Sequence, residues 1–308
     1  MTEMTDAPDA TGTARPTRRA ASFGAHALGL LQVTHPLPSA LYVLAVAIFS
    51  LLAAGAHHTS PDASELARAL VGVACAQIAI GSLNDYRDRA ADALHQPNKP
   101  IARGVIASWE ALALVTLATL ANIGLMATLG PFAFALGLLI EGLGVAYDLW
   151  FKGTPVSGLL YAIYFPLIPL LAWALFGNWQ PFLLWLLPIG ALLGVAMNIA
   201  NSLPDLEGDL ASGARGLPHL LGLRRGLYAA WAAPVGVVIL IWTLHLSRLA
   251  PAHLPALLVA TAAGLLSVAL AILLYLRKPL PVTLKVTFYV QALGVITLAG
   301  AWLAAVAL

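Results

Sequence analysis

Charged residues are scarce in this sequence, and so is cysteine. Only 10% of the 308 residues are Asp, Glu, Lys or Arg, whereas a water-soluble protein carries about 25%. The single cysteine, Cys75, excludes an intrachain disulfide, and we interpret it as a core residue because it stands in an apolar run. No set of histidines and cysteines has the spacing of a zinc site. A soluble, disulfide-bonded or zinc-bound fold is therefore excluded.

The N-terminal segment also lacks a feature, the apolar stretch of a cleavable signal sequence. It mixes acidic residues with Arg15, Arg18 and Arg19 and is rich in Ala, Thr and Pro. We predict a disordered tail over residues 1–22, followed by a single transmembrane domain over residues 23–308.

Apolar residues are what the sequence has in abundance, at 60%. Several apolar runs approach the roughly 20 residues that an α-helix needs to cross a bilayer. Turn residues such as Gly130-Pro131 separate neighbouring runs. We predict an all-α, polytopic membrane protein with nine transmembrane helices, at about residues 37–56, 65–83, 108–129, 131–149, 155–176, 181–202, 225–246, 252–276 and 283–307.

Lysine and arginine are distributed unevenly about these spans. All 16 except Arg68 and Arg248 lie in the tail or at the ends of spans on the same side as the tail. Because loops rich in Lys and Arg stay in the cytoplasm, we predict an integral protein of the cell inner membrane. Its N-terminus and the loops on that side are expected to be cytoplasmic, and its C-terminus to lie outside.

One polar segment, residues 84–104, interrupts the apolar pattern. Asn84, Asp88 and Asp92 lie four residues apart, which places them on one face of a helix. Basic residues follow directly, among them Lys99. Oxygen-bearing side chains beside basic residues are typical of a site that binds a hard cation and an anionic ligand.

The same spacing recurs later in the chain, in Asn201, Asp205 and Asp209. Four predicted spans separate the two motifs, so both motifs lie on the same side of the membrane. This pattern predicts a parallel internal repeat, with motifs at 84–92 and 201–209, in which two helical units face each other. Facing aspartate clusters could hold two Mg²⁺ ions with a diphosphate between them.

Three motifs together give the chain a resemblance to a known family. They are Asn84 to Asp92 with the following Asn98-Lys-Pro-Ile-Ala-Arg-Gly104, then Tyr147-Asp148-Leu-Trp-Phe-Lys152, and then Asn201-Ser-Leu-Pro-Asp205-Leu-Glu-Gly-Asp209. In this order, at the ends of spans two, four and six, they resemble the UbiA superfamily of intramembrane prenyltransferases. The resemblance covers about residues 30–300.

The resemblance implies a fold and a set of site residues. The fold is a bundle of nine helices around a central cavity open to lipid. The residues implied as catalytic Mg²⁺ ligands are Asp88, Asp92, Asp205 and Asp209. The residues expected to contact the diphosphate are Asn84, Lys99, Arg103, Tyr147, Lys152 and Asn201.

The implied reaction is Mg²⁺-dependent transfer of an isoprenyl group from a prenyl diphosphate to a lipophilic acceptor, which we expect to be aromatic. Cations would stabilise the negative charge of the leaving diphosphate, and a dry cavity would protect the prenyl cation from water. The expected partners are the prenyl diphosphate, the acceptor and membrane lipid, and no nucleic acid.

Three further residues are candidates for the acceptor side of the site. Glu141 is an intramembrane acid and so a functional candidate, although it could instead be paired within the bundle. Asp148 could contact the substrate or orient a basic residue. Asn198 could line the cavity or form a hydrogen bond between helices.

Two other functions stay open at this point. An intramembrane terpene cyclase would use the same diphosphate-ionising residues without a second substrate. An ion-coupled transporter would use the acids as an ion site, but transporter sites usually lie near the middle of the membrane, and these acids lie at one face.

Overall fold

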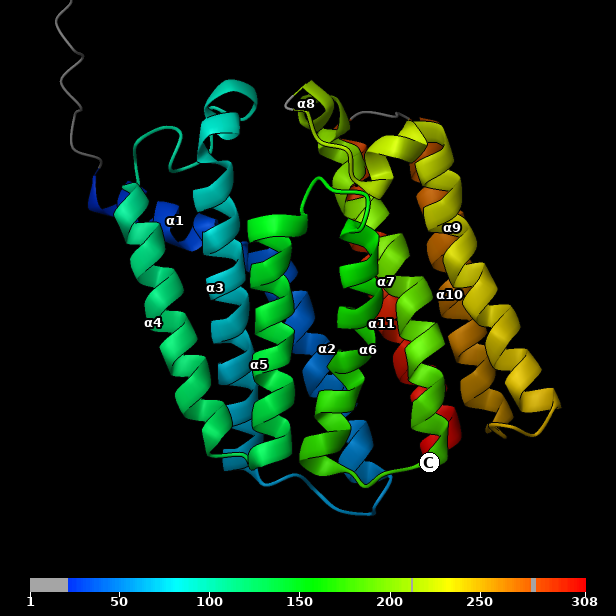
Figure 1. Cartoon of the computed structure of the whole chain (residues 1–308). Coiled ribbons are helices and arrows are strands. Elements are labelled where there is room, and N and C mark those ends of the chain that lie inside the picture. Colours follow the sequence, from blue (N-terminus) through cyan, green and yellow to red (C-terminus); the bar gives the residue numbers. More distant parts are fainter. Residues whose placement is uncertain (1–21, 212, 278–280) are drawn as a thin grey trace, which may run out of the picture.

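The computed structural model describes residues 22–211, 213–277 and 281–308. The tail predicted over residues 1–22 therefore lies outside the described residues, apart from Ser22. The described residues form helices and contain no strand (Figure 1). Nine of the helical segments are long and apolar enough to cross a membrane, which confirms the predicted fold class.

The helices follow the predicted spans closely, with a short helix before the first span. In chain order they are α1 (Phe23–Val33), α2 (Pro36–Gly55), α3 (Ala63–His95), α4 (Ser108–Ala127), α5 (Pro131–Ala146), the π-helical turn Tyr147–Phe151, α6 (Ser157–Phe176), the 3₁₀ turn Pro181–Trp185, α7 (Leu186–Ser202), the 3₁₀ turn Leu203–Asp205, α8 (Leu206–Ala211), α9 (Leu217–Leu246), α10 (Leu254–Arg277) and α11 (Pro281–Ala307).

Two helix ends differ from the prediction. The second span was expected to end at residue 83, but α3 continues to His95 and carries the first polar motif as a regular helix. The seventh was expected to begin at residue 225, but α9 begins at Leu217. Its first turns are bent at Gly222, whose φ of 70° is a conformation that favours glycine.

Close packing of α6 against α7 brings two site-bearing helices together. Pro166 lies inside α6, where it removes a backbone donor. Gly190 of α7 faces it, and a Cβ atom at Gly190 would lie only 2.7 Å from the Pro166 nitrogen. A small residue is therefore required at this crossing, as at many contacts between membrane helices.

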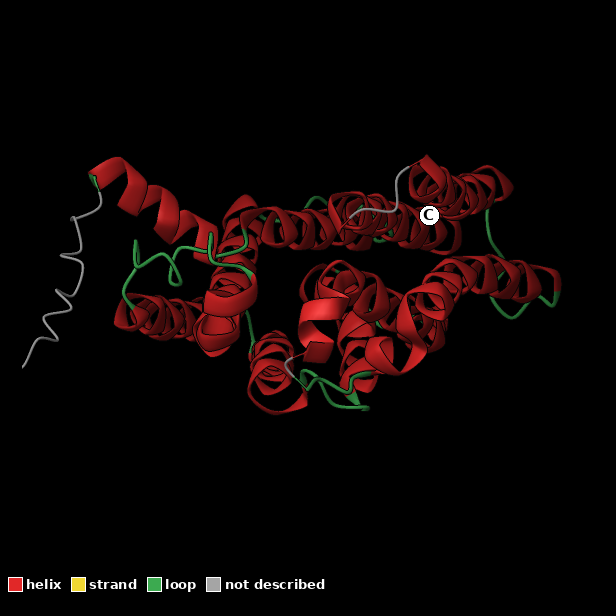
Figure 2. Cartoon of the chain, turned by 90° about the horizontal axis from the view of Figure 1, so that it is seen from above, coloured by secondary structure: helices red, strands yellow, loops and turns green. Residues whose placement is uncertain are grey.

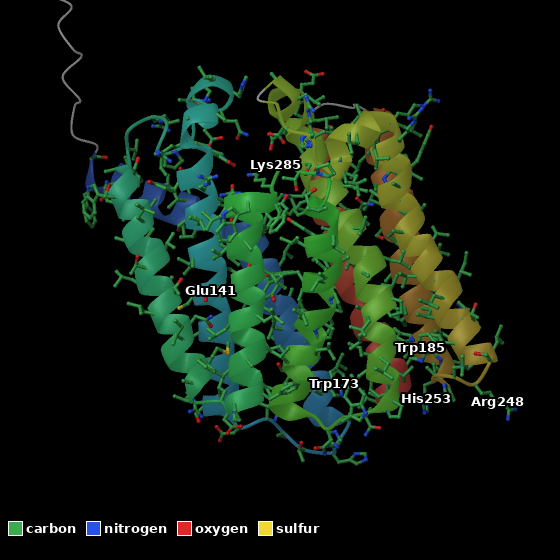
Figure 3. The ribbon with its side chains drawn as sticks, in the orientation of Figure 1. Glu141, Trp173, Trp185, Arg248, His253 and Lys285 are labelled. Carbon is green, nitrogen blue, oxygen red and sulfur yellow. The ribbon has the colours of Figure 1, made fainter. Side chains whose placement is uncertain are left out.

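The bundle has two unlike ends. Viewed from above, it is elongated rather than round (Figure 2). Trp173 lies near one end, and Lys285 lies near the opposite end (Figure 3). Trp173 packs edge-on against Phe182, and Phe182 packs edge-on against Trp302, with ring centroids 5.9 and 6.4 Å apart. Aromatic packing therefore fills the end away from Lys285.

Candidate active site

The first acidic motif lies on α3, as the four-residue spacing predicts. The Asn84 amide donates a hydrogen bond to Oδ1 of Asp148, at 2.8 Å. Asp88 pairs with the Lys152 ammonium. These two contacts join α3 to the turn that follows α5, so the first and second sequence motifs meet in space.

Lys99 lies in the loop after α3 and bridges two carboxylates of that helix. Its Nζ lies 3.0 Å from Asp85 Oδ1 and 3.0 Å from Asp92 Oδ2. Burial opposes the charged form of Lys99, but the charges of Asp85 and Asp92 outweigh burial and raise its pKa above the ordinary value. Lys99 is therefore an ammonium group that folds the loop back onto α3.

The second motif adopts a π-helical turn, Tyr147–Phe151. The Lys152 amide donates to the Tyr147 carbonyl at 2.7 Å, the five-residue step of a π-helix. Burial opposes the charge on Lys152, but the carboxylates of Asp88 and Asp148 outweigh burial and raise its pKa. π-Helical turns are frequent at functional sites, and this one directs a charged lysine toward α3.

The third motif does not form one regular helix, although its four-residue spacing is typical of one helix face. Asn201 lies in the last turn of α7, Asp205 in the following 3₁₀ turn and Asp209 in α8. Pro204 explains the change, because its ring cannot occupy the interior of an α-helix without losing a hydrogen bond. The three side chains nevertheless line the same cavity.

That cavity has a volume of about 1700 Å³ and brings the two aspartate motifs together. Of the predicted site residues, those that line it are Asn84, Asp88, Asp92, Lys99, Tyr147, Asp148, Lys152, Asn201, Asp205 and Asp209. Its walls come from α3, the π-helical turn, α6, the end of α7, α8 and α11. Residues far apart in the sequence thus form one charged chamber.

Three predicted residues do not line this cavity. Arg103 is exposed in the loop between α3 and α4. Glu141 is buried and accepts hydrogen bonds from Thr119 and Asn122 of α4. Asn198 is buried behind Tyr147 and donates to its hydroxyl at 3.3 Å. Of the two alternatives for Asn198, the structure therefore agrees with a hydrogen bond between helices. For Glu141 it agrees with pairing inside the bundle.

Other residues that line the cavity are not among the predicted site residues. Lys285 of α11 lines the cavity, and its charge acts on Asp205. His35, in the turn before α2, lines it as well. Lys285 could have been found from the sequence, because it is a lone lysine one turn inside the last span. The position of His35 could not, because it depends on how the turn before α2 folds. Aromatic residues of α6 and α11 line the rest: Tyr161, Phe165, Phe288 and Tyr289.

The carboxylates of this cavity fit a hard divalent cation. Within the part of the chain that the structure describes, no three His, Cys, Asp or Glu side chains gather closely enough to hold a metal alone. Mg²⁺ usually takes only one or two carboxylates, with waters and substrate phosphates as its other ligands. Among the described residues, the Asp205 carboxylate has no hydrogen bond or ion pair, and the Asp209 carboxylate has one only with His219, at 3.3 Å. Free carboxylate oxygens therefore line the chamber.

These features define an integral membrane protein with an all-α bundle and an acid-lined chamber at one end. Comparison with known proteins makes the assignment specific. The chain belongs to the UbiA prenyltransferase family, whose model matches residues 43–291. The resemblance inferred from the three motifs is thereby confirmed.

Individual relatives agree with this assignment. The chain is 34% identical over 167 residues to digeranylgeranylglyceryl phosphate synthase of Natronomonas pharaonis, covering 54% of this chain and 60% of that protein. It is 27% identical over 165 residues to 4-hydroxybenzoate octaprenyltransferase of Vibrio atlanticus, covering 53% of this chain and 58% of that one. The matches thus span about 60% of the length of these relatives.

Solved structures share the fold. A UbiA homolog from Archaeoglobus fulgidus, bound to GPP and Mg²⁺, superposes with a TM-score of 0.69 at 18% identity, covering 89% of this chain and 99% of that one.

Proposed function

We propose that this protein transfers an isoprenyl group from a prenyl diphosphate to a lipophilic acceptor within the membrane, in a Mg²⁺-dependent reaction. The observation that supports this most is that Asp88, Asp92, Asp205 and Asp209 line one cavity together with Lys99 and Lys152. Carboxylates and lysines in one cavity suit an anionic ligand that binds together with a divalent metal ion.

In this proposal the acidic and the basic residues of the cavity have different roles. The four aspartates would hold Mg²⁺, which when bound neutralises charge on the leaving diphosphate. Lys99 and Lys152 would turn from their aspartate partners toward phosphate oxygens and stabilise the negative charge that develops there. Asn84 and Asn201 would donate hydrogen bonds beside them.

The apolar part of the cavity would hold the prenyl chain. Tyr161 and Phe165 of α6 stack at 5.8 Å between ring centroids, and both line the cavity with Phe288 of α11. Their rings would exclude water from the carbocation that forms when the diphosphate leaves, and aromatic faces also attract cations. A cavity lined by both charged and aromatic side chains suits the charged group and the apolar chain of a prenyl diphosphate.

The acceptor is proposed to be lipophilic, as expected for a reaction inside a bilayer. Named relatives include a digeranylgeranylglyceryl phosphate synthase and a 4-hydroxybenzoate octaprenyltransferase. Product analysis should therefore offer phenolic acids and glyceryl phosphate lipids side by side. Product formed from the prenyl diphosphate alone would instead indicate a cyclase.

The decisive experiment measures diphosphate release and prenylated product with purified protein in lipid nanodiscs. Asp88→Asn and Asp205→Asn should each abolish Mg²⁺-dependent release, because each removes a carboxylate from the proposed metal set. Removal of divalent metal with EDTA should do the same to the wild type, and Mg²⁺ should restore it.

Asp62→Asn is the matched control for these variants. Asp62 caps the other end of α3, accepting from the Ser64 and Glu65 amides at 2.9 Å, and does not line the cavity. Asparagine caps a helix about as well as aspartate, so this variant should keep both its stability and its diphosphate release. Wild-type turnover in both Asp88→Asn and Asp205→Asn would contradict the proposal.

A further inference from the structure

His35 is held in an unusual conformation at the edge of the cavity. It stands in the turn between α1 and α2 with φ 50° and ψ 61°, a left-handed conformation that is uncommon outside glycine. Strained backbone of this kind clusters at functional sites. The turn lies against Gly81 of α3, where a Cβ atom would come within 3.0 Å of the Thr34 carbonyl. Ser39 fixes the turn from the other side by donating to that carbonyl at 2.9 Å.

The side chain of His35 forms a pair with an aspartate that the metal set does not include. His35 Nε2 lies 3.0 Å from Asp85 Oδ1, and the Asp85 side chain is only 4% exposed. The same Oδ1 also accepts from Lys99. An ionised carboxylate can only accept hydrogen bonds, so Nε2 carries the hydrogen, and in the neutral form of the ring Nδ1 has a free electron pair.

That free nitrogen is available to a ligand. His35 lines the cavity, its side chain is 35% exposed, and no described residue bonds Nδ1. Two other charged groups lie near the His35–Asp85 pair: Lys99 from the loop, which donates to the same Asp85 oxygen, and Asp148 from the π-helical turn, which interacts electrostatically with His35. Asp148 is only 5% exposed and is held by Asn84, so it is less accessible to a substrate.

We propose that His35 is the catalytic base that removes the acceptor proton, with Asp85 as its positioning residue. This inference rests on the proposed prenyl transfer. The bond between the prenyl carbon and the diphosphate oxygen breaks, and its electron pair leaves with the diphosphate. The acceptor atom bonds to that carbon and gives up its proton to Nδ1 of His35. The imidazolium, stabilised by the Asp85 carboxylate, then releases the proton to water.

The test is His35→Gln. A glutamine amide can still donate to Asp85, but it has no basic nitrogen. Prenyl transfer should fall by about 10²- to 10⁴-fold, the usual contribution of a general base, while the KM for the prenyl diphosphate stays unchanged. The acid limb of the pH profile of kcat/KM should disappear, and added imidazole should restore part of the rate.

His26→Gln is the matched control. His26 is also 35% exposed and pairs with a carboxylate, Glu110, at 2.9 Å, but it does not line the cavity. This variant should keep the wild-type rate and pH profile. Asn tolerates a left-handed backbone better than Gln, so His35→Asn replaces His35→Gln if the latter unfolds.

The outcomes separate this inference from the proposed function. Wild-type protein without Mg²⁺-dependent transfer would overturn the proposed function, and the base with it. Active wild type with an equally active His35→Gln variant would overturn the base alone. A folded, slow variant that keeps the acid limb and does not respond to imidazole would also overturn it, because His35 would then act through structure only.

Discussion

Two lysines form ion pairs with carboxylates in the cavity. Each of them contacts an aspartate that we propose as a Mg²⁺ ligand. Lys152 pairs with Asp88, and Lys99 with Asp92. The lysines neutralise carboxylates that would otherwise repel one another across the cavity. We infer that substrate binding would be an exchange: the aspartates would hold Mg²⁺, and the ammonium groups of Lys99 and Lys152 would turn to the diphosphate.

This exchange predicts a specific defect for Lys152→Met. Hydrogen bonds to charged groups contribute about 1.5–3 kcal/mol, or roughly 10- to 150-fold. We expect kcat/KM for the prenyl diphosphate to fall by about that factor in steady-state assays. Lys152→Arg, which keeps the charge, should lose less. Equal kcat/KM in Lys152→Met and wild type would show that the diphosphate is bound without this lysine.

At the scale of the helix, Glu141 shows what an intramembrane acid can do away from the site. It lies on α5, is 4% exposed, and accepts from Thr119 Oγ1 at 2.5 Å and Asn122 Nδ2 at 2.6 Å. Figure 3 places it near the middle of the bundle's height. These bonds join α4 to α5, so the acid helps to fix how the two helices meet.

We therefore predict that Glu141→Leu destabilises the protein and leaves catalysis intact. The substitution leaves the buried Asn122 amide unpaired, which costs about 1–3 kcal/mol. The melting temperature in detergent should fall, and Glu141→Gln should lower it less, because an amide oxygen still accepts. Activity measured well below the melting temperature should match the wild type. Loss of acceptor turnover at unchanged stability would instead return Glu141 to the acceptor side.

The helical elements also show what could be predicted from the sequence and what could not. Spacing predicted the face of α3, because a regular helix maps four-residue steps onto one side. It did not predict the break at Pro204 or the π-helical turn at Tyr147, because these depend on which backbone hydrogen bonds the surrounding fold permits. Arg103 stands in a loop, where no periodicity relates sequence position to direction, and it is exposed and does not line the cavity.

At the scale of the whole molecule, charge and aromatic packing divide the bundle into two ends. The acids and their lysines gather around the cavity, while the rings of Trp173, Phe182 and Trp302 close the opposite end. The two aspartate motifs lie on α3 and on the α7–α8 segment, and both line the same cavity. A parallel repeat would produce this arrangement, and the repeat stays a prediction.

The same division predicts how the protein crosses the membrane. Arg225 and Arg248 are both exposed and flank the long part of α9, and Figure 3 shows Arg248 at the end away from Lys285. In a Cys75→Ala background, Arg248→Cys should react with a membrane-impermeant maleimide in right-side-out vesicles. Arg225→Cys should react only after the vesicles are opened, because the positive-inside rule predicts that the basic side faces the cytoplasm.

The reverse labelling pattern would contradict this orientation, and labelling of both cysteines from one side would show that α9 does not cross. The expected pattern has a functional consequence. Arg225 belongs to the same side of the predicted topology as the two aspartate motifs, so its protection would place the charged mouth of the cavity in the cytoplasm. A prenyl diphosphate could then bring its charged group to the cavity without crossing the membrane, where moving charge through hydrocarbon costs at least several kcal/mol.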